Sequence, residues 1–329
     1  MIAAPPFSLV TAPLFSFAVT FALIWWLIRG NTLKVLDHPN PRSLHTKPVP
    51  RTGGIGLMLG VLASWALLPT TLPLPVWMSV GLLMAVSLAD DVLTLPVWQR
   101  LLTHGIAAAW LSTTLLSGAY GWMLVIVIAF AIIWMTNLFN FMDGSDGLAG
   151  GMTLIGFSCY GLTAWLAGNE TFAMINLCIA AAAAAFLLFN FHPARIFMGD
   201  AGAIPLGFLA AVFGVMGWID GLWPLWLPLL VFSPFIADAT ATLAKRSLRG
   251  EQIWQAHREH YYQRLVQSGF GHRNTALLGY VLMLAAGASA VWAMGQNTAV
   301  QLGVGMAWGG AYLVMMFVSD RYWERRCGD

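Results

Sequence analysis

The chain has 329 residues, of which 59% are hydrophobic and only 9% are charged. Because soluble domains carry about a quarter charged residues, this composition excludes a water-soluble globular protein. The net charge of +2 does not indicate nucleic acid as a partner, and three cysteines predict no disulfide framework. The first apolar run lacks a preceding basic segment and a clear cleavage site, so we expect a retained helix rather than a signal peptide.

Apolar runs of about 20 residues, the length of a bilayer-spanning helix, recur along the whole chain. No long polar stretch separates them, so the sequence predicts a single transmembrane domain, 1–329, in an all-α polytopic membrane protein. About eleven transmembrane helices are expected, with ten as the alternative, because several runs are short. The predicted spans are 8–28, 54–70, 75–92, 101–117, 121–138, 148–167, 171–189, 201–218, 222–244, 275–294 and 298–318.

With this number of spans, all 16 Lys and Arg residues fall on one side of the membrane. The positive-inside rule identifies that side as cytoplasmic, which predicts an N-terminus outside and a C-terminus inside. All seven histidines lie on the same side, so an aqueous ligand would bind from the cytoplasm. The predicted cytoplasmic loops are about 29–53, 91–100, 139–147, 190–200 and 245–274.

The first of these loops, 29–53, is basic and stiffened by prolines, and it carries Lys47 and Arg51. These cations either bind phosphate or simply belong to a positive-inside loop. The glycine-rich run at 53–56 is not a dinucleotide fingerprint, because no strand–helix–strand context surrounds it.

Two neighbouring carboxylates, Asp90 and Asp91, close the third predicted span. Two adjacent carboxylates repel each other unless a cation or a shared proton relieves the repulsion. Successive helical residues point about 100° apart, so one carboxylate could hold a metal while the other faces a substrate. The alternative is a pair of solvated acids at the membrane surface.

Polar residues recur at every third position from 137 to 146. This spacing predicts one amide and carboxylate stripe on a helical face, formed by Asn137, Asn140, Asp143 and Asp146. Such hard oxygen ligands suit Mg²⁺, particularly where phosphate completes the shell. A polar helix cap followed by a turn would explain part of the same pattern.

The loop at 190–200 carries Asn190, Arg195 and Asp200. Asp200 directly precedes an apolar span, where it could cap a helix or accompany a bound anion, and Arg195 would suit a phosphate. Gly-Asp before a helix is by itself a weak signal, because it is often only a cap.

The long loop 245–274 contains His257 and His260. If this segment is helical, the two histidines share a face, and contacts to phosphate are the favoured interpretation. Zinc is a poor alternative without a third ligand nearby. A plain interfacial helix is the simpler reading.

These acids, amides, histidines and arginines come from separate loops yet face one side of the membrane. That arrangement favours a metal–pyrophosphate site over an ion path, which would need acids distributed through the bilayer. A secondary transporter of an anionic metabolite remains the alternative from another class, although Asp238 is the one acid well inside a span.

In their order and spacing, these motifs resemble the polyprenyl-phosphate N-acetylhexosamine-1-phosphate transferases, glycosyltransferase family 4. The resemblance covers about 37–262, and its most specific motif is the 137–149 segment. The others are Pro50-Arg51-x-Gly53-Gly54, Asp90-Asp91 and Phe197-Met198-Gly199-Asp200-x-Gly202.

The resemblance implies transfer of a HexNAc-1-phosphate from a UDP-HexNAc to undecaprenyl phosphate, with release of UMP, at the cytoplasmic face of a bacterial inner membrane. It implies Mg²⁺, with Mn²⁺ as a substitute, and membrane lipid as a partner; a homodimer is compatible with it. The implied catalytic residues are Asp90, Asp91, Asp143, His257 and His260. The implied metal ligands are Asp200 with Asp91 or Asp143. The implied substrate-binding residues are Asn137, Asn140, Asp146, Asn190, Arg195, Arg51 and Lys47.

Two departures from the family pattern concern the donor sugar. Val92-Leu93-Thr94 follows the aspartate pair where a charged residue is frequent, and a run of three histidines is replaced by His257-Arg258-Glu259-His260. The chain thus looks like the branch that initiates O-antigen in lipopolysaccharide, with UDP-GlcNAc, UDP-FucNAc or UDP-QuiNAc as donor. Phospho-MurNAc-pentapeptide transfer in peptidoglycan synthesis is the alternative within the family.

Overall fold

The structure is a computed structural model that describes residues 7–30, 35–39, 44–45, 47–69, 72–93, 95–252 and 257–327. Helices dominate it, with one two-stranded antiparallel hairpin in the first predicted loop. The elements are α1 (Phe7–Arg29), β1 (Leu36–Asp37), β2 (Val49–Pro50), α2 (Gly53–Trp65), α3 (Leu74–Leu93), α4 (Val97–Leu116), α5 (Trp122–Phe141), α6 (Leu148–Leu166), α7 (Glu170–Asn190), α8 (Asp200–Ile219), α9 (Trp226–Val231), α10 (Ser233–Leu248), α11 (Tyr261–Leu265), a π-helical turn η1 (Val266–Phe270), α12 (Gly271–Met294) and α13 (Thr298–Cys327).

Each predicted span contains helix, which confirms the all-α class, and the long apolar helices agree with a polytopic membrane protein. In the described residues, seven helices are long and apolar enough to cross a membrane: α1, α3, α5, α7, α8, α12 and α13. The count of about eleven and the orientation of the termini stay predictions. The second span, 54–70, is a helix of only 13 residues.

The predicted span 222–244 is broken into α9 and α10. Phe232 joins them with non-helical dihedrals, and Pro234 is the second residue of α10. Proline has no N–H to donate to the preceding turn, so it interrupts a helix but fits its first positions. The loop predicted at 245–274 is likewise shorter than expected, because α10 continues to Leu248 and α11, η1 and the start of α12 occupy much of the rest.

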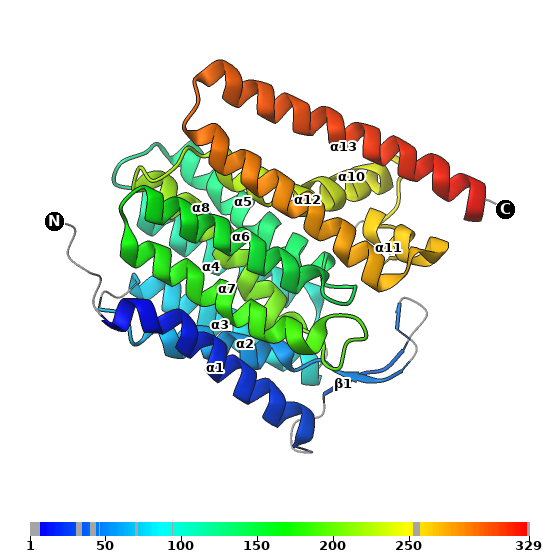
Figure 1. The fold of residues 1–329 in the computed structure, drawn as a ribbon, viewed down its shortest axis with the longest axis horizontal. Coiled ribbons are helices and arrows are strands. Elements are labelled where there is room, and N and C mark those ends of the chain that lie inside the picture. The colour runs from blue at the N-terminus through cyan, green and yellow to red at the C-terminus, as the bar shows by residue number, and fades with distance from the viewer. Residues whose placement is uncertain are drawn as a thin grey trace.

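The helices form a bundle around a continuous apolar core (Figure 1). Large aromatic side chains fill its middle: the Trp65 ring contacts Phe213, and Tyr160 stacks on Trp223. Trp65, Tyr160 and Phe213 are all buried. α13 lies along one side of the bundle, next to α12 and α10, and none of its most apolar stretch is buried.

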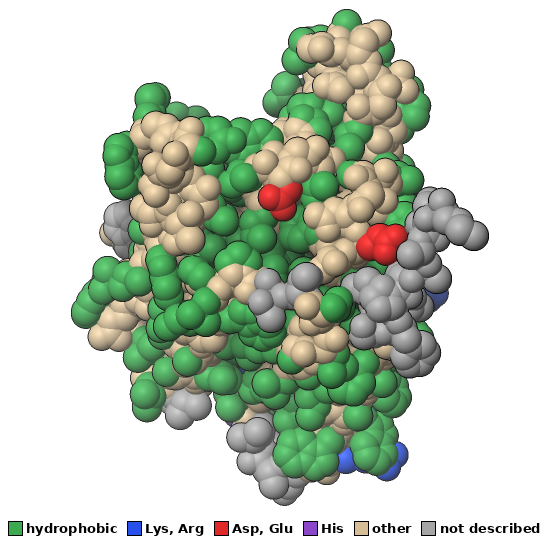
Figure 2. Space-filling model, turned by 90° about the vertical axis from the view of Figure 1, so that its left-hand side faces the viewer, with side chains coloured by type: hydrophobic (Ala, Val, Ile, Leu, Met, Phe, Trp, Pro, Cys, Tyr) green, Lys and Arg blue, Asp and Glu red, His purple; other side chains and the backbone are tan. Residues whose placement is uncertain are grey.

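The loops predicted to share one side of the membrane meet at one end of the bundle, called here the site end. Figure 1 shows the β-hairpin, α11 and the C-terminus on that side. The opposite end is shown in Figure 2: its surface is mostly hydrophobic with two small acidic spots, and Lys and Arg appear only at its margins. The clustering of the loops agrees with the parity of the predicted spans.

Candidate active site

A backbone joint at the site end connects the start of α2 to the start of α8. The Gly53 and Gly54 N–H groups donate to the carbonyls of Phe197 and Met198 at 2.9 and 2.8 Å. A Cβ added to Gly54 would lie 2.4 Å from the backbone nitrogen of Gly202, so a side chain does not fit between the two helices. The glycines of the two motifs therefore let the backbones touch, and this contact brings Arg51 beside the start of α8.

Asp200 is the first residue of α8, as its place before an apolar span predicts. Gly199 precedes it with φ +69°, a left-handed conformation that glycine adopts without strain. The Asp200 carboxylate accepts a hydrogen bond from the Asn140 side chain and lies 3.4 Å from Arg100 Nη1. Asp200 and Asn140, which are predicted site residues from separate loops, are thus in contact.

The two carboxylates of the aspartate pair point to different cations. Asp90 Oδ2 lies 2.9 Å from Arg100 Nη1, and Asp90 Oδ1 accepts from the Leu95 N–H at 2.6 Å. Asp91 Oδ1 lies 3.3 Å from Arg51 Nη2, which also donates to the Asp91 carbonyl at 2.9 Å. The divergence expected from helical geometry is present.

Arg100, near the start of α4, is a site residue that the sequence reasoning missed. Its Nη1 group lies between Asp90 and Asp200 and contacts both. One arginine near a helix start carries no sequence signal of its own. Only its spacing of ten residues from Asp90, across a short turn, could have suggested that it folds back on the pair.

Asp143 belongs to the turn after α5 and accepts a hydrogen bond from the Gly199 N–H. Burial raises the pKa of the Asp143 carboxyl well above its ordinary value, and the negative charge of nearby Asp200 acts in the same direction. Asp143 and Asp200 thus form a carboxylate pair that a cation would stabilise.

The oxygen ligands of Asp91, Asp143 and Asp200 have the hard chemistry that suits Mg²⁺. Asp200 lies close enough to both others to act on their electrostatics. The described residues nevertheless contain no preformed group of three or more His, Cys, Asp or Glu that could hold a metal. The donor set fits Mg²⁺ in its chemistry, and one Asp200 oxygen, Oδ2, lies 3.4 Å from Arg100 Nη1.

The helical stripe predicted over 137–146 is wrong in its second half. α5 ends at Phe141, so Asp143 and Asp146 lie in a turn, and Gly147 has φ +75°. Closely spaced Asp, Gly and Ser residues favour turns because glycine permits positive φ and aspartate bonds the local backbone. Asn137 is on the helix, where its side chain donates to the Ile133 carbonyl at 2.7 Å rather than reaching the carboxylates.

Asp146 and Asn190 hold neighbouring loops together. Asp146 Oδ2 lies 2.6 Å from His192 Nδ1 and accepts from the Ala194 N–H at 3.1 Å. Asn190 Oδ1 accepts from the Gly147 N–H at 2.9 Å, while its Nδ2 donates to the Ile196 carbonyl at 2.9 Å. Both polar atoms of Asn190 are engaged with the backbone, so the structure gives this residue a positioning role next to the carboxylates.

Replacing Asn190 by alanine is expected to lower the free energy of unfolding by about 1–3 kcal/mol, because two buried backbone groups lose their partner. Asn190 is buried, with 4% of its surface exposed. Thermal unfolding of purified protein in detergent measures the effect. Asn274→Ala, at an exposed amide, is the matched control, and equal midpoints for the two variants would contradict the prediction.

His257 and His260 lie together, with ring centroids 4.8 Å apart. They are not on a helix, so the prediction that they share a helical face is wrong. His260 precedes α11 with extended dihedrals and is buried, and its Nδ1 lies 3.3 Å from Asp238 Oδ1. Burial lowers the pKa of His257 to about 4, and the neighbouring His260 and Arg246 act in the same direction. A neutral His257 offers a phosphate a hydrogen bond and no charge.

This depressed pKa has a consequence for stability. Between about pH 6.5, the ordinary histidine value, and about pH 4, the unfolded chain binds a proton at His257 that the folded chain does not. Stability is therefore expected to fall as the pH is lowered through this window. Unfolding midpoints at pH 7 and pH 5 should differ less in His257→Gln than in the wild type, and an unchanged difference would refute the assignment.

Lys47 and Arg195 are both exposed at the site end. Arg195 donates to the Leu188 carbonyl at 3.1 Å and lies over the Phe189 ring, while Lys47 is in the hairpin segment before β2. In the part of the chain that the structure describes, neither residue contacts the four site aspartates, which are Asp90, Asp91, Asp143 and Asp200. Asp37 of β1, in contrast, adds negative charge near Asp91 and Asp143 and was not among the predicted site residues.

Known proteins match this sequence. The family described as glycosyl transferase family 4 matches residues 74–218, a range that includes the four site aspartates and Asn140. The chain is 28% identical over 283 residues to a probable undecaprenyl-phosphate N-acetylglucosaminyl 1-phosphate transferase of Bacillus subtilis, covering 80% of this chain and 79% of the relative. It is also 28% identical to a decaprenyl-phosphate N-acetylglucosaminephosphotransferase of Mycobacterium leprae, covering 87% and 86%.

A phospho-N-acetylmuramoyl-pentapeptide-transferase of Listeria welshimeri is 31% identical over 146 residues, but this covers only 43% of the chain and 44% of the relative. The family match and the longer relatives agree with the motifs and with the helical membrane fold. The chain is therefore similar to glycosyl transferase family 4 over residues 74–218, and over most of its length to polyprenyl-phosphate N-acetylglucosamine-1-phosphate transferases.

Proposed function

We propose that this protein transfers a HexNAc-1-phosphate from a UDP-HexNAc to undecaprenyl phosphate at the cytoplasmic face of a bacterial inner membrane. The observation that carries the proposal is the convergence of Asp90, Asp91, Asp143 and Asp200 with two arginines at one end of the bundle. Phosphoryl transfer depends mainly on positioning and on neutralisation of charge, and this set of groups supplies both.

In the proposed reaction, an oxygen of the acceptor phosphate attacks the β-phosphorus of the donor. The bond from that phosphorus to the bridging oxygen breaks, UMP leaves with the electron pair, and undecaprenyl-diphospho-HexNAc forms. Asp90 orients or deprotonates the acceptor phosphate, while Asn140, Asp143 and Asp146 line the nucleotide pocket. Arg195 and the histidine pair contact phosphate oxygens.

Asp200, with Asp91 or Asp143, would hold Mg²⁺, which when bound neutralises the charge on the donor's pyrophosphate. The raised pKa of Asp143 supports this assignment. It shows that a negative charge is costly at this buried position beside Asp200, and a bound cation would offset that cost. Two of these carboxylates also pair with arginines, Asp91 with Arg51 and Asp200 with Arg100.

Among donors, UDP-GlcNAc is favoured by the names of the longer relatives, ahead of UDP-FucNAc and UDP-QuiNAc. An O-antigen role rests on the resemblance in sequence alone. Phospho-MurNAc-pentapeptide transfer is a weaker candidate, because the Listeria welshimeri relative of that name matches only 43% of the chain.

The experiment that tests the proposal measures UMP release by purified protein in detergent with undecaprenyl phosphate, Mg²⁺ and each donor in turn. UDP-MurNAc-pentapeptide is included as the competing donor. Release that requires both acceptor and Mg²⁺ supports the proposal and identifies the sugar. Stoichiometric UMP release without acceptor would instead indicate a covalent intermediate, and release with the pentapeptide donor alone would overturn the substrate assignment.

A further inference from the structure

α13 forms the outer wall of two adjoining cavities. Its apolar stretch packs little against the bundle, yet its last turns are tied to α10 and α11 by ion pairs of Asp320. Lys245 pairs with Asp320 Oδ2, and Arg264 Nη1 lies 3.1 Å from Asp320 Oδ1. The helix is therefore held at the site end while space remains behind it.

The first cavity has a volume of about 540 Å³ and lies between α10, α12 and α13. Its walls are almost entirely apolar and include Phe235, Leu282, Met283 and Met315. This volume lies within the range of ligand sites, and an apolar cavity of this kind accepts a hydrocarbon chain rather than water.

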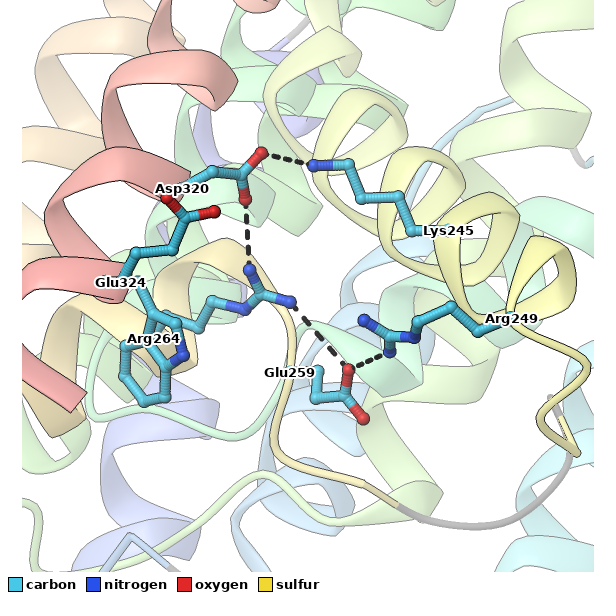
Figure 3. Close-up of a pocket in the computed structure, with 7 residues that line it drawn as sticks. Lys245, Arg249, Glu259, Arg264, Asp320 and Glu324 are labelled. Carbon is cyan, nitrogen blue, oxygen red and sulfur yellow. Dashed lines mark hydrogen bonds and ion pairs between the residues drawn. The ribbon is translucent and has the colours of Figure 1, made fainter. Parts of the chain in front are cut away.

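The second cavity, of about 440 Å³, is lined by three cations and three acids (Figure 3). The cations are Lys245, Arg249 and Arg264, and the acids are Glu259, Asp320 and Glu324. Tyr261 lies between the two cavities: it lines the apolar one, and its hydroxyl oxygen is 2.5 Å from Lys245 Nζ. An apolar space thus adjoins a charged space of balanced sign.

Balanced charge fits a zwitterionic ligand better than an anionic one. The cations already pair with Glu259 and Asp320, so a phosphate would share the arginines and the lysine with these acids. Arg264 lies over the Trp323 ring at 5.9 Å, so an ammonium group would meet the Glu324 carboxylate. The partner found for Glu324 in the described structure is Arg321 of its own helix, at 3.6 Å, so its carboxylate is not tied to another element. A ligand that carries a phosphate but no cationic group would offer nothing for the acids of this cavity to bind.

We propose that the two cavities together bind one zwitterionic phospholipid of the bilayer, with an acyl chain behind α13 and a phosphoethanolamine head in the charged cavity. The charged cavity lies apart from the four carboxylates proposed for transfer, although both cavities adjoin the histidine pair. Glu259 of the charged cavity lies between His257 and His260 in the chain, and Oδ1 of Asp238, which lines the apolar cavity, is 3.3 Å from His260 Nδ1. Among the described residues, none that lines the charged cavity forms a hydrogen bond or ion pair with Asp90, Asp91, Asp143 or Asp200. The bound lipid would fix α13 against the bundle.

Native mass spectrometry of the full-length protein tests this proposal in the absence of donor, so it does not depend on transfer activity. The probes are dioleoyl phosphatidylethanolamine, dioleoyl phosphatidylglycerol and undecaprenyl phosphate. We expect one phosphatidylethanolamine to be retained about tenfold more tightly than phosphatidylglycerol, a difference of about 1.4 kcal/mol. Equal retention of the two, or displacement of the bound lipid by undecaprenyl phosphate, would overturn the proposal.

Variants separate the chain site from the head site. Met315→Trp fills the apolar cavity and should reduce retention at least about tenfold, whereas Met315→Leu should keep it. Phe317→Trp, at an exposed position on the same helix that does not line the cavity, is the matched control. Glu324→Gln should remove the preference for ethanolamine over glycerol, and a preference that survives this change would contradict the head assignment.

Discussion

Asp200→Asn is expected to reduce UMP release at least about 100-fold, the scale of removing one main electrostatic group from a phosphoryl-transfer site. Asparagine preserves the size of the side chain and can still bond to Asn140 and Arg100. It removes a negative charge that acts on both Asp91 and Asp143. The initial rate at saturating donor and acceptor measures the effect, and a titration with Mg²⁺ shows whether its apparent affinity falls.

The same helix supplies the control. Asp220 follows the last residue of α8 at the opposite end of the bundle and is exposed. Asp220→Asn should retain the wild-type rate, because no group of the site lies near it. A rate in Asp200→Asn equal to that of Asp220→Asn would show that the metal and site assignment is wrong.

Gly54→Ala is expected to abolish most activity and to destabilise the fold by about 1–3 kcal/mol or more, through overpacking at the joint of α2 and α8. The added methyl group would lie 2.4 Å from the Gly202 nitrogen and 2.6 Å from the Met198 carbonyl oxygen. These are backbone atoms, so no side chain can move aside. The two helices would have to separate, carrying Arg51 away from Asp91.

Thermal unfolding and UMP release of the same preparation measure both effects. Gly81→Ala in α3 is the matched control, since nothing lies within 4 Å of the position of its Cβ. There the substitution should be neutral or slightly stabilising, by about 0.5–1 kcal/mol, because alanine loses less backbone freedom on folding. If Gly54→Ala behaved like Gly81→Ala, the backbone joint would not be what positions the site.

The sequence by itself determined the class of the protein. Apolar segments spaced along the chain require bilayer-length helices, because an unpaired backbone is costly in lipid and helices satisfy their own hydrogen bonds. Asp90, Asp91, Asn140 and Asp200 could also be singled out, since polar groups at the ends of such helices are expensive and need a function. The place of Asp200 at the start of a helix followed from the apolar run behind it.

The tertiary structure alone decided which of these residues meet. Arg100 reaches Asp90 across the short turn between α3 and α4. It reaches Asp200 because these two helices pack against α8, a long-range contact that no local pattern encodes. Asn137 belongs to the same three-residue pattern as Asn140, yet its side chain donates to a carbonyl of its own helix. Both polar side-chain atoms of Asn190 form hydrogen bonds with the backbone. Whether a polar group binds a ligand or another part of the chain depends on which partners the packing of the helices brings within hydrogen-bonding distance. The periodicity of the sequence does not reveal these partners.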